Sequence, residues 1–305
     1  MSRPLAILML LVTTLIWGFA FSAQKSGMST MGPLTFTATR FLLGGLVVLP
    51  LGLREYHKRG IPLTGRQWLQ LLGLCSAFFM GTILQQTGLT LTTVTNAGFL
   101  TALYVLFVPL IAFIVQRTRP HPIVWLCVPL ALIGTYYLNG GEFDRFNLGD
   151  LLMVFGAVFW AIHVLMLSHV ARDTGLPMFV SSLTFLFAGA VALVLVPFLE
   201  TPSFAGISAS WGQLVYSGVL ATALAFTMQA IGQQYVPPAN AAIILSAESL
   251  FAALGGALVL GERLPPVGYA GAALIFIAIV LVETVPILVA RGRRAEQPAA
   301  GGLGS

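Results

Sequence analysis

FLLGG at Phe41–Gly45 returns as FLFAG at Phe185–Gly189, 144 residues further along the chain. An offset of 143 or 144 residues also pairs Trp17 with Trp160, Trp68 with Trp211, Gln86 with Gln229 and Phe107 with Phe251. Matches that keep one offset over most of a chain indicate two copies of one structural unit. We therefore expect a duplicated fold, with residues 1–141 and 142–290 as its halves and residues 291–305 as a disordered tail.

The composition places both halves in a membrane. Hydrophobic residues make up 57% of the 305-residue chain and charged residues 8%, with a mean hydropathy of +0.92, whereas a soluble domain carries about 25% charged residues. Apolar runs of about 20 residues, long enough to cross a bilayer as a helix, recur with short connections. We predict an all-α integral membrane protein with ten transmembrane helices, at residues 4–23, 33–53, 66–87, 94–116, 120–138, 149–170, 176–199, 211–232, 238–260 and 266–289.

Each copy contains five of the predicted spans. Because five is an odd number, the second copy enters the membrane from the opposite side, and the repeats are predicted to be inverted. Inverted repeats are the architecture of many secondary transporters, in which two copies that rock against each other give an inward-open and an outward-open state. The duplication therefore favours transport before any motif is considered.

The basic residues sort by loop and do not gather on one soluble face, so the net charge of +5 does not indicate a nucleic-acid partner. With the N-terminus inside, three basic residues face outward, namely Lys25, Arg145 and Arg263. Eleven face the cytoplasm: Arg3, Arg54, Lys58, Arg59, Arg66, Arg117, Arg119, Arg172, Arg291, Arg293 and Arg294. This asymmetry follows the positive-inside rule and predicts that both termini are cytoplasmic.

One carboxylate interrupts the apolar ninth span. Glu248, in ILSAESLFAAL (Ile244–Leu254), lies roughly 15 Å along its predicted helix, close to the bilayer midplane. A charge at this depth costs on the order of 2.5–3.5 kcal/mol on insertion scales, so Glu248 is a candidate for proton coupling or for binding a substrate ammonium group. A neutral Glu248 hydrogen-bonded to a neighbouring helix is the structural alternative. Its partner in the first repeat is Tyr104.

Arg40 and His163 are two further ionisable residues inside predicted spans. Arg40 could hold a substrate carboxylate, could lock one conformation by pairing with helix-end carbonyls and an acidic side chain, or could extend its charged end to water. His163 is either a packed hydrogen-bonding residue or part of a site. We assign Arg40, together with Glu248, to coupling or gating, and His163 to substrate binding.

Aromatic and amide side chains complete the predicted site. Trp17 and Trp160 lie deeper than the interfacial belts where membrane tryptophans gather, so they are either walls of a pocket or core residues. Asn240, near the start of the ninth span, is expected to cap that helix. The predicted substrate-binding residues are Trp17, Gln86, Tyr104, Trp160, His163, Gln229 and Glu248. We predict no catalytic residue, no metal site and no cofactor.

Several segments together resemble EamA-type members of the drug/metabolite transporter superfamily: LVTTLIWGFAF, ATRFLLGGL, AGFLTALYVLFVPL and PPANAAIILSAESLFAALGGALVLGERLPPVGYAGAALI. The resemblance implies a ten-helix bundle with a central cavity in a bacterial inner membrane, and the subgroup expected from it is the YddG-type exporters of aromatic and neutral amino acids. Glu248 matches the acidic position of the ESLFA-like stretch, and Arg40 the basic position of the TRFLL stretch. Tyr104 opposite Glu248 argues against a symmetric two-carboxylate mechanism.

We therefore expect a monomeric secondary transporter that moves small metabolites, amino acids above all, outward across the membrane, with protons as the candidate coupling ion. An exporter or exchanger of drugs or other metabolites with the same fold is the alternative. A channel is disfavoured because no ring of charges or filter-like loop is present in the sequence. An intramembrane enzyme is a remote alternative, since H-E-x-x-H and G-x-S-x-G are absent and NLGD lacks the first glycine of G-x-G-D.

Overall fold

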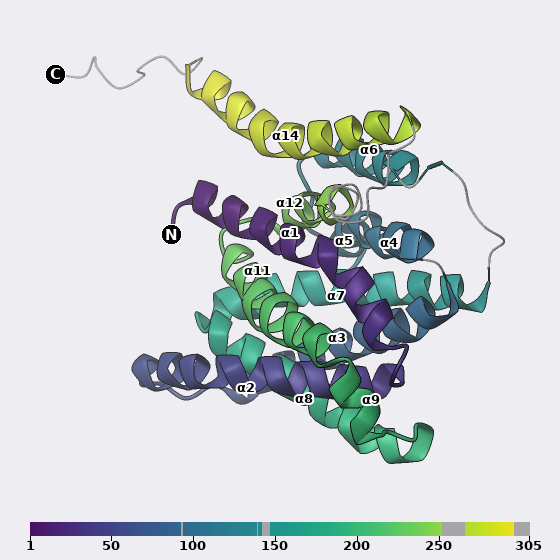
Figure 1. Cartoon of the computed structure of the whole chain (residues 1–305). Coiled ribbons are helices and arrows are strands. Elements are labelled where there is room, and N and C mark those ends of the chain that lie inside the picture. The colour runs from purple at the N-terminus through teal and green to yellow at the C-terminus, as the bar shows by residue number, and fades with distance from the viewer. Residues whose placement is uncertain (93, 139, 142–146, 252–265, 296–305) are drawn as a thin grey trace.

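The computed structural model describes residues 1–92, 94–138, 140–141, 147–251 and 266–295, and every regular element in these ranges is a helix (Figure 1). The elements are α1 (Arg3–Gly27), α2 (Pro33–Arg59), α3 (Gly65–Leu91), α4 (Val94–Ala102), α5 (Tyr104–Ile114), α6 (Ile123–Leu138), α7 (Leu148–Thr174), α8 (Pro177–Leu199), α9 (Phe204–Ala209), α10 (Trp211–Val215), the π-helix η1 (Tyr216–Phe226), α11 (Thr227–Gly232), α12 (Pro238–Leu245) and α14 (Pro266–Ala295). A further helical turn covers residues 248–251.

The predicted membrane character is confirmed. In the described part of the chain, eight segments are long and apolar enough to cross a bilayer, and the 16-residue α6 is a shorter apolar helix. The ninth predicted span, 238–260, is described only as far as residue 251, so the count of ten stays a prediction. The predicted tail overlaps the end of α14, which reaches Ala295, and its remainder lies outside the described residues.

Local sequence explains where the long helices begin and end. Thr64 with Gln67, and Asn147 with Asp150, form capping boxes that satisfy free N–H groups at the starts of α3 and α7. Glycines in the left-handed region close α2 and α7 at Gly60 (φ 69°) and Gly175 (φ 67°).

The helices pack in pairs, and each main pair joins a helix of the first half to a helix of the second. Figure 1 shows α6 with α14 as one outer layer and α2 with α8 as the opposite one, with α1, α3, α4, α5, α7, α11 and α12 between them. Between the layers, α1 packs along η1 and α11, and α3 packs along α7. The predicted repeat makes α1 the counterpart of α7, and α3 the counterpart of α10–η1–α11. These two contacts are therefore equivalent, as a duplicated unit requires.

Two carboxylates show that α2 and α8 run antiparallel. Glu200, just after α8, accepts hydrogen bonds from the backbone N–H groups of Leu34 (2.7 Å) and Thr35 (2.9 Å) at the start of α2. Glu55, near the end of α2, accepts from Met178 (2.9 Å) and Phe179 (3.0 Å) at the start of α8. Each helix thus ends where the other begins. Opposite directions for the second helices of the two halves are what inverted repeats require.

The segment Trp211–Gly232, expected to be one regular helix, contains a π-helix over half its length. Side chains of α1 donate hydrogen bonds to η1 carbonyls: Thr13 Oγ1 to Ala225 O and Trp17 Nε1 to Ala221 O, both at 3.0 Å. In the reverse direction Tyr216 donates to Ile16 O at 2.6 Å. Wide helical turns of this kind are rare and often occur at functional sites. Here they bind α1 closely to the centre of the bundle.

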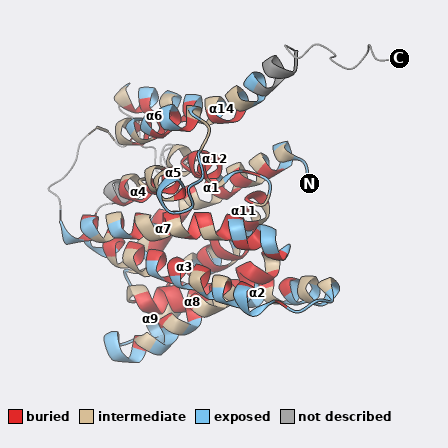
Figure 2. Cartoon of the chain, turned by 180° about the vertical axis from the view of Figure 1, so that it is seen from behind, coloured by how far each residue is buried: buried red, intermediate tan, exposed pale blue. Residues whose placement is uncertain are grey.

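Apolar side chains cover the outside as well as the interior. Figure 2 shows buried residues on α2 and α8 as well as on the helices between the two outer layers. Large apolar side chains nevertheless remain exposed on the outer faces, among them Leu193, Val194 and Phe198 of α8 and Phe276 of α14. An apolar exterior of this extent fits contact with lipid.

Candidate functional site

A cavity in the middle of the bundle collects most of the predicted site. About 590 Å³ of unfilled space, part of it open to the surface, lies among α1, α2, α3, α4, α5, α7, η1, α11, α12 and the residues after α12. Its lining includes six of the eight predicted residues: Trp17, Arg40, Tyr104, Trp160, Gln229 and Glu248. On α1 it is lined by Trp17, Ala20, Phe21 and Gln24, so it lies toward the C-terminal half of that helix.

Two helix breaks place Tyr104 and Glu248 in the cavity. Leu103 N–H bonds to Leu100 O, and Ala247 N–H to Ile244 O, each a tight i→i+3 bond that ends a helical segment. These four residues are two equivalent pairs at an offset of 144. Neither break contains glycine or proline. A short 3₁₀ step within a helix often marks a hinge.

Aromatic rings form one wall of the cavity. Phe226 stacks on Trp160, with ring centroids 5.8 Å apart and 13° between the planes. The Phe226 ring centroid lies 4.4 Å from that of Trp17. Trp17 donates its indole N–H to Ala221 O. Trp160 Nε1 is buried and has no partner among the described residues. The wall therefore offers ring faces to a bound molecule.

His163 and Gln86 lie behind the lining. The His163 ring is 2% exposed and is covered by Phe78 and Trp160, at centroid distances of 5.1 and 5.5 Å. The Gln86 side chain is fully buried and donates to Gln24 Oε1 at 2.6 Å. Both residues touch the lining and neither belongs to it.

The lining residues that were not predicted include Gln24, Thr101 and Phe226. Gln24 is a buried polar residue one position beyond the predicted end of the first span, so a longer span would have included it. Thr101 accepts a hydrogen bond from Gln85 Nε2 at 3.1 Å. Nothing in the sequence separates Thr101 or Phe226 from ordinary packing residues.

The cavity holds charges of both signs. Arg40 is 4% exposed and Glu248 is half-buried. No ion pair joins them, and Glu248 forms none with any other part of the chain that the structure covers. Gln229 Oε1 is buried without a partner in the same ranges. No group of three or more His, Cys, Asp or Glu side chains that could hold a metal occurs among the described residues.

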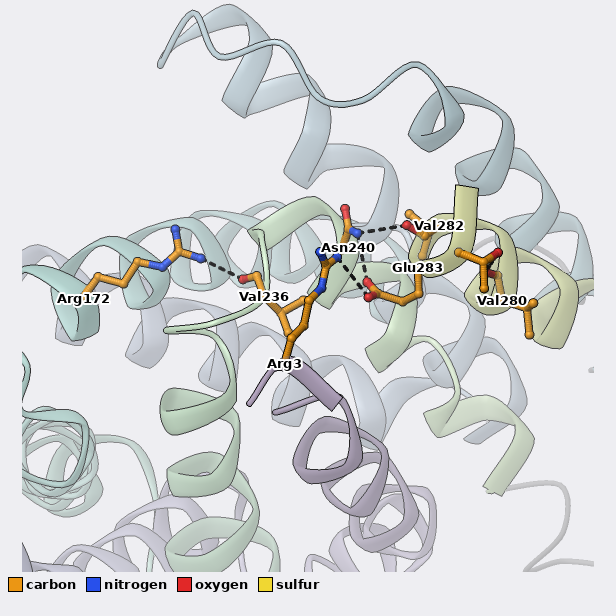
Figure 3. A network of polar contacts seen from close by, with 8 residues as sticks. Arg3, Arg172, Val236, Asn240, Val280, Val282 and Glu283 are labelled. Carbon is orange, nitrogen blue, oxygen red and sulfur yellow. Dashed lines mark hydrogen bonds and ion pairs between the residues drawn. The ribbon is translucent and has the colours of Figure 1, made fainter. Parts of the chain in front are cut away.

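A polar network joins three helices at the N-terminal end of α1. Figure 3 shows Arg3, Asn240 and Glu283 meeting where α1, α12 and α14 come together. Arg3 Nη2 lies 3.0 Å from Glu283 Oε2, and Asn240 Nδ2 donates to Glu283 Oε1 at 2.9 Å. Nearby, Ala6 and Leu10 are fully buried. The prediction that Asn240 caps its helix is wrong, because its side chain reaches across to α14 and no side chain caps α12.

Two cationic side chains tie equivalent helix junctions. Lys25 Nζ, in the last turn of α1, donates to Thr92 O at 2.7 Å. Arg172 Nη2, in the last turn of α7, donates to Val236 O at 3.0 Å (Figure 3). Thr92 and Val236 are counterparts at an offset of 144. Each half thus anchors the end of its first helix to the junction before its fourth.

Comparison with known proteins agrees with this architecture. The model of the EamA-like transporter family matches twice, over residues 4–140 and 147–284. An uncharacterized transporter of Archaeoglobus fulgidus is 34% identical over 283 residues, covering 92% of this chain and 86% of its own. The uncharacterized transporter YwfM of Bacillus subtilis is 28% identical over 297 residues, covering 92% and 94%. A solved structure, described only as the crystal structure of a protein, aligns with a TM-score of 0.77 at 21% identity over 97% of this chain and 100% of its own. The chain, with two matches that span nearly its whole length, belongs to the EamA-like transporter family.

Proposed function

We propose that this transporter carries amino acids, chiefly those with neutral or aromatic side chains, outward across a bacterial inner membrane. The observation that carries the proposal is the cavity itself, in which stacked aromatic rings lie beside one buried cation and one carboxylate. Pockets that bind small molecules combine apolar walls with a few placed polar groups. A zwitterion with an apolar side chain matches that combination.

Each predicted residue has a role in this proposal. Trp17 and Trp160 contact the apolar part of the solute, and Tyr104, Gln229 and Glu248 contact its polar part. Gln86 and His163 support this lining from behind. Glu248 and Arg40, as the charged groups, carry coupling or gating. With Glu248 accepting a proton or a substrate ammonium group, protons are the candidate coupling ion.

Alternating access between the two halves provides the mechanism. The polar network at Arg3 and Glu283 closes one end of the bundle, while the cavity extends toward the other end of α1. The breaks at Leu103 and Ala247 let the two parts of each broken helix tilt about the cavity, so that its open side changes. A wider range of metabolites or drugs handled by the same cavity is the alternative, since an aromatic wall selects weakly among apolar groups.

Counterflow in proteoliposomes tests the proposal. Liposomes loaded with unlabelled phenylalanine should accumulate labelled phenylalanine above equilibrium, and a panel of other amino acids should compete according to side-chain type. A channel would only equilibrate the label. Accumulation of other metabolites but of no amino acid would contradict the substrate assignment. Dependence on an imposed pH gradient would support proton coupling, and indifference to it would indicate facilitated exchange.

Cysteine labelling tests the opposite orientation proposed for the two halves, residues 1–141 and 142–290. In a chain with Cys75 and Cys127 replaced by alanine, Lys58→Cys lies in the last turn of α2 and Thr201→Cys follows α8. We expect an impermeant maleimide to label Thr201→Cys in intact cells, and to label Lys58→Cys only after the membrane is opened. Labelling of both from the same side would contradict the inverted arrangement.

A further inference from the structure

Arg40 is a buried cation without a counter-ion in the described structure. Its side chain lines the cavity and is 4% exposed, and no carboxylate among the described residues pairs with it. Its one hydrogen bond there runs from Nη1 to Gln24 Oε1 at 2.8 Å, and its buried Nε has no partner. A charged group withdrawn from water normally needs an opposite charge and a full set of hydrogen bonds. Arg40 has neither from these residues.

The residues around Arg40 only partly replace the missing counter-ion and hydrogen bonds. The guanidinium carbon lies 4.4 Å from the Phe41 ring centroid and 5.5 Å from that of Phe36. Attraction between a cation and aromatic rings is weaker than pairing with a carboxylate. Glu248 lines the same cavity and does not pair with Arg40. The guanidinium is therefore left able to accept an anion.

Gln24 fixes the direction of the guanidinium. Its Oε1 accepts from Arg40 Nη1 at 2.8 Å and from Gln86 Nε2 at 2.6 Å. Three side chains from α1, α2 and α3 are thus joined at one oxygen atom. Because a carbonyl oxygen has two lone pairs, both donors are satisfied there, and the remaining Arg40 donors are free for another acceptor.

We propose that Arg40, held by Gln24, is the subsite for a carboxylate group of the transported solute. The proposal rests on the proposed function, because it requires the solute to enter this cavity. The planar guanidinium fork matches a carboxylate with two parallel hydrogen bonds, which a point charge cannot reproduce. Gln24 is the positioning residue. The carboxylate of the solute docks on Arg40, and its positive group, where present, lies toward Glu248.

Iodide and caesium quenching of tryptophan emission tests the anion site without a substrate. Replacing Trp68, Trp125 and Trp211 by phenylalanine leaves Trp17 and Trp160, both in the cavity lining. At equal ionic strength we expect iodide to quench this variant more strongly than caesium. Arg40→Gln should reduce the iodide quenching several-fold, and Arg66→Gln, at an exposed arginine, should not. Equal iodide quenching with and without Arg40 would overturn the proposal.

A matched pair of compounds tests the carboxylate class. 3-Phenylpropionate and 3-phenylpropanamide have the same shape and differ in charge. We expect the carboxylate to quench or shift the emission of the purified protein at about tenfold lower concentration than the amide. Arg40→Gln should abolish this preference, and Arg40→Lys should retain part of it because the charge remains without the fork. An unchanged preference in Arg40→Gln would overturn the subsite.

Gln24→Glu keeps the experiment decisive if Arg40→Gln does not fold. This variant places a carboxylate of the protein itself 2.8 Å from Arg40 Nη1, and that carboxylate becomes the counter-ion of the guanidinium. We expect it to fold and to lose both the iodide effect and the carboxylate preference, and full retention of both would contradict the proposal. Failure of amino-acid counterflow with both effects intact would overturn the proposed function alone. Counterflow that is unchanged in a correctly inserted Arg40→Gln variant would overturn the subsite alone.

Discussion

Leu186 of α8 packs directly onto Gly45 of α2, so closely that a Cβ on the glycine would lie 2.7 Å from the leucine Cγ. The reciprocal contact is present too, since a Cβ on Gly189 would lie 2.8 Å from Leu42 Cγ. Gly45 and Gly189 are counterparts at an offset of 144 residues, as are Leu42 and Leu186. The α2–α8 interface therefore contains the same glycine–leucine contact twice, and a two-fold rotation would relate the two copies.

Gly189→Ala should destabilise the protein by about 1–3 kcal/mol, because the added methyl group overpacks a contact that cannot separate without moving the α2 backbone. Thermal unfolding in detergent measures the change. Gly212→Ala is the matched control, since nothing lies within 4 Å of a Cβ added there. Equal unfolding temperatures for the two variants would show that the interface relaxes at no cost.

Glu200→Ala should cost about 0.5–2 kcal/mol of stability, comparable to removing a helix N-cap, because the N–H groups of Leu34 and Thr35 lose their acceptor. Glu55→Ala should have a similar effect through the start of α8. The two caps lie at opposite ends of the pair, so the double variant should show the sum of the single losses. Lys58→Ala, at an exposed position, is the control, and a loss of the same size there would assign the effect to surface charge.

Glu248→Gln should reduce counterflow by about tenfold or more while insertion and thermal stability stay as in the unmodified protein. Glutamine keeps the size and the hydrogen-bonding capacity of the side chain but carries neither a negative charge nor a transferable proton. The initial rate per inserted molecule is the measurement. A rate like that of the unmodified protein would assign Glu248 to helix packing.

Arg3→Gln should favour opening of the end of the bundle that the Arg3–Glu283 ion pair closes. The partly exposed pair contributes about 1 kcal/mol at most, which corresponds to about a fivefold change in the open population. In a chain free of other cysteines, Thr13→Cys in the buried α1–η1 contact reports that opening through its maleimide reaction rate. No change in the rate would mean that apolar packing at Ala6 and Leu10 is sufficient for closure.

Much of the fold followed from hydropathy and from the repeat. Long apolar runs predicted the helical spans that the structure contains, and the expected family is confirmed. The offset predicted which helices are counterparts, and the antiparallel α2–α8 pair agrees with inversion. These features depend on the periodic burial of many residues, so a single sequence is sufficient to predict them. The break at Leu103 and the π-helix η1 depend on packing between helices, and no glycine or proline lies at the break at Leu103.

The site was predicted less completely than the fold. Intramembrane charges and deep tryptophans pointed to Arg40, Glu248, Trp17 and Trp160, which share one cavity, and their functional roles stay predictions. Gln24 was missed because the hydropathy of the first span falls just before it. Asn240 was assigned to a local cap, since a sequence cannot show that Glu283 of a distant helix lies within reach.

The duplicated breaks at Leu103 and Ala247 carry a consequence for vectorial movement. Under the proposed alternating access, perfect duplication would give the two access states equal energy, and the resting protein would face both compartments equally. Tyr104 after one break and Glu248 after the other remove that degeneracy, because one side presents a phenol where the other presents an acid. Any preference of the resting protein for one compartment must therefore come from such differences between equivalent residues and not from the duplicated fold. Exchanging Tyr104 and Glu248 would be the direct way to make the resting protein prefer the other compartment.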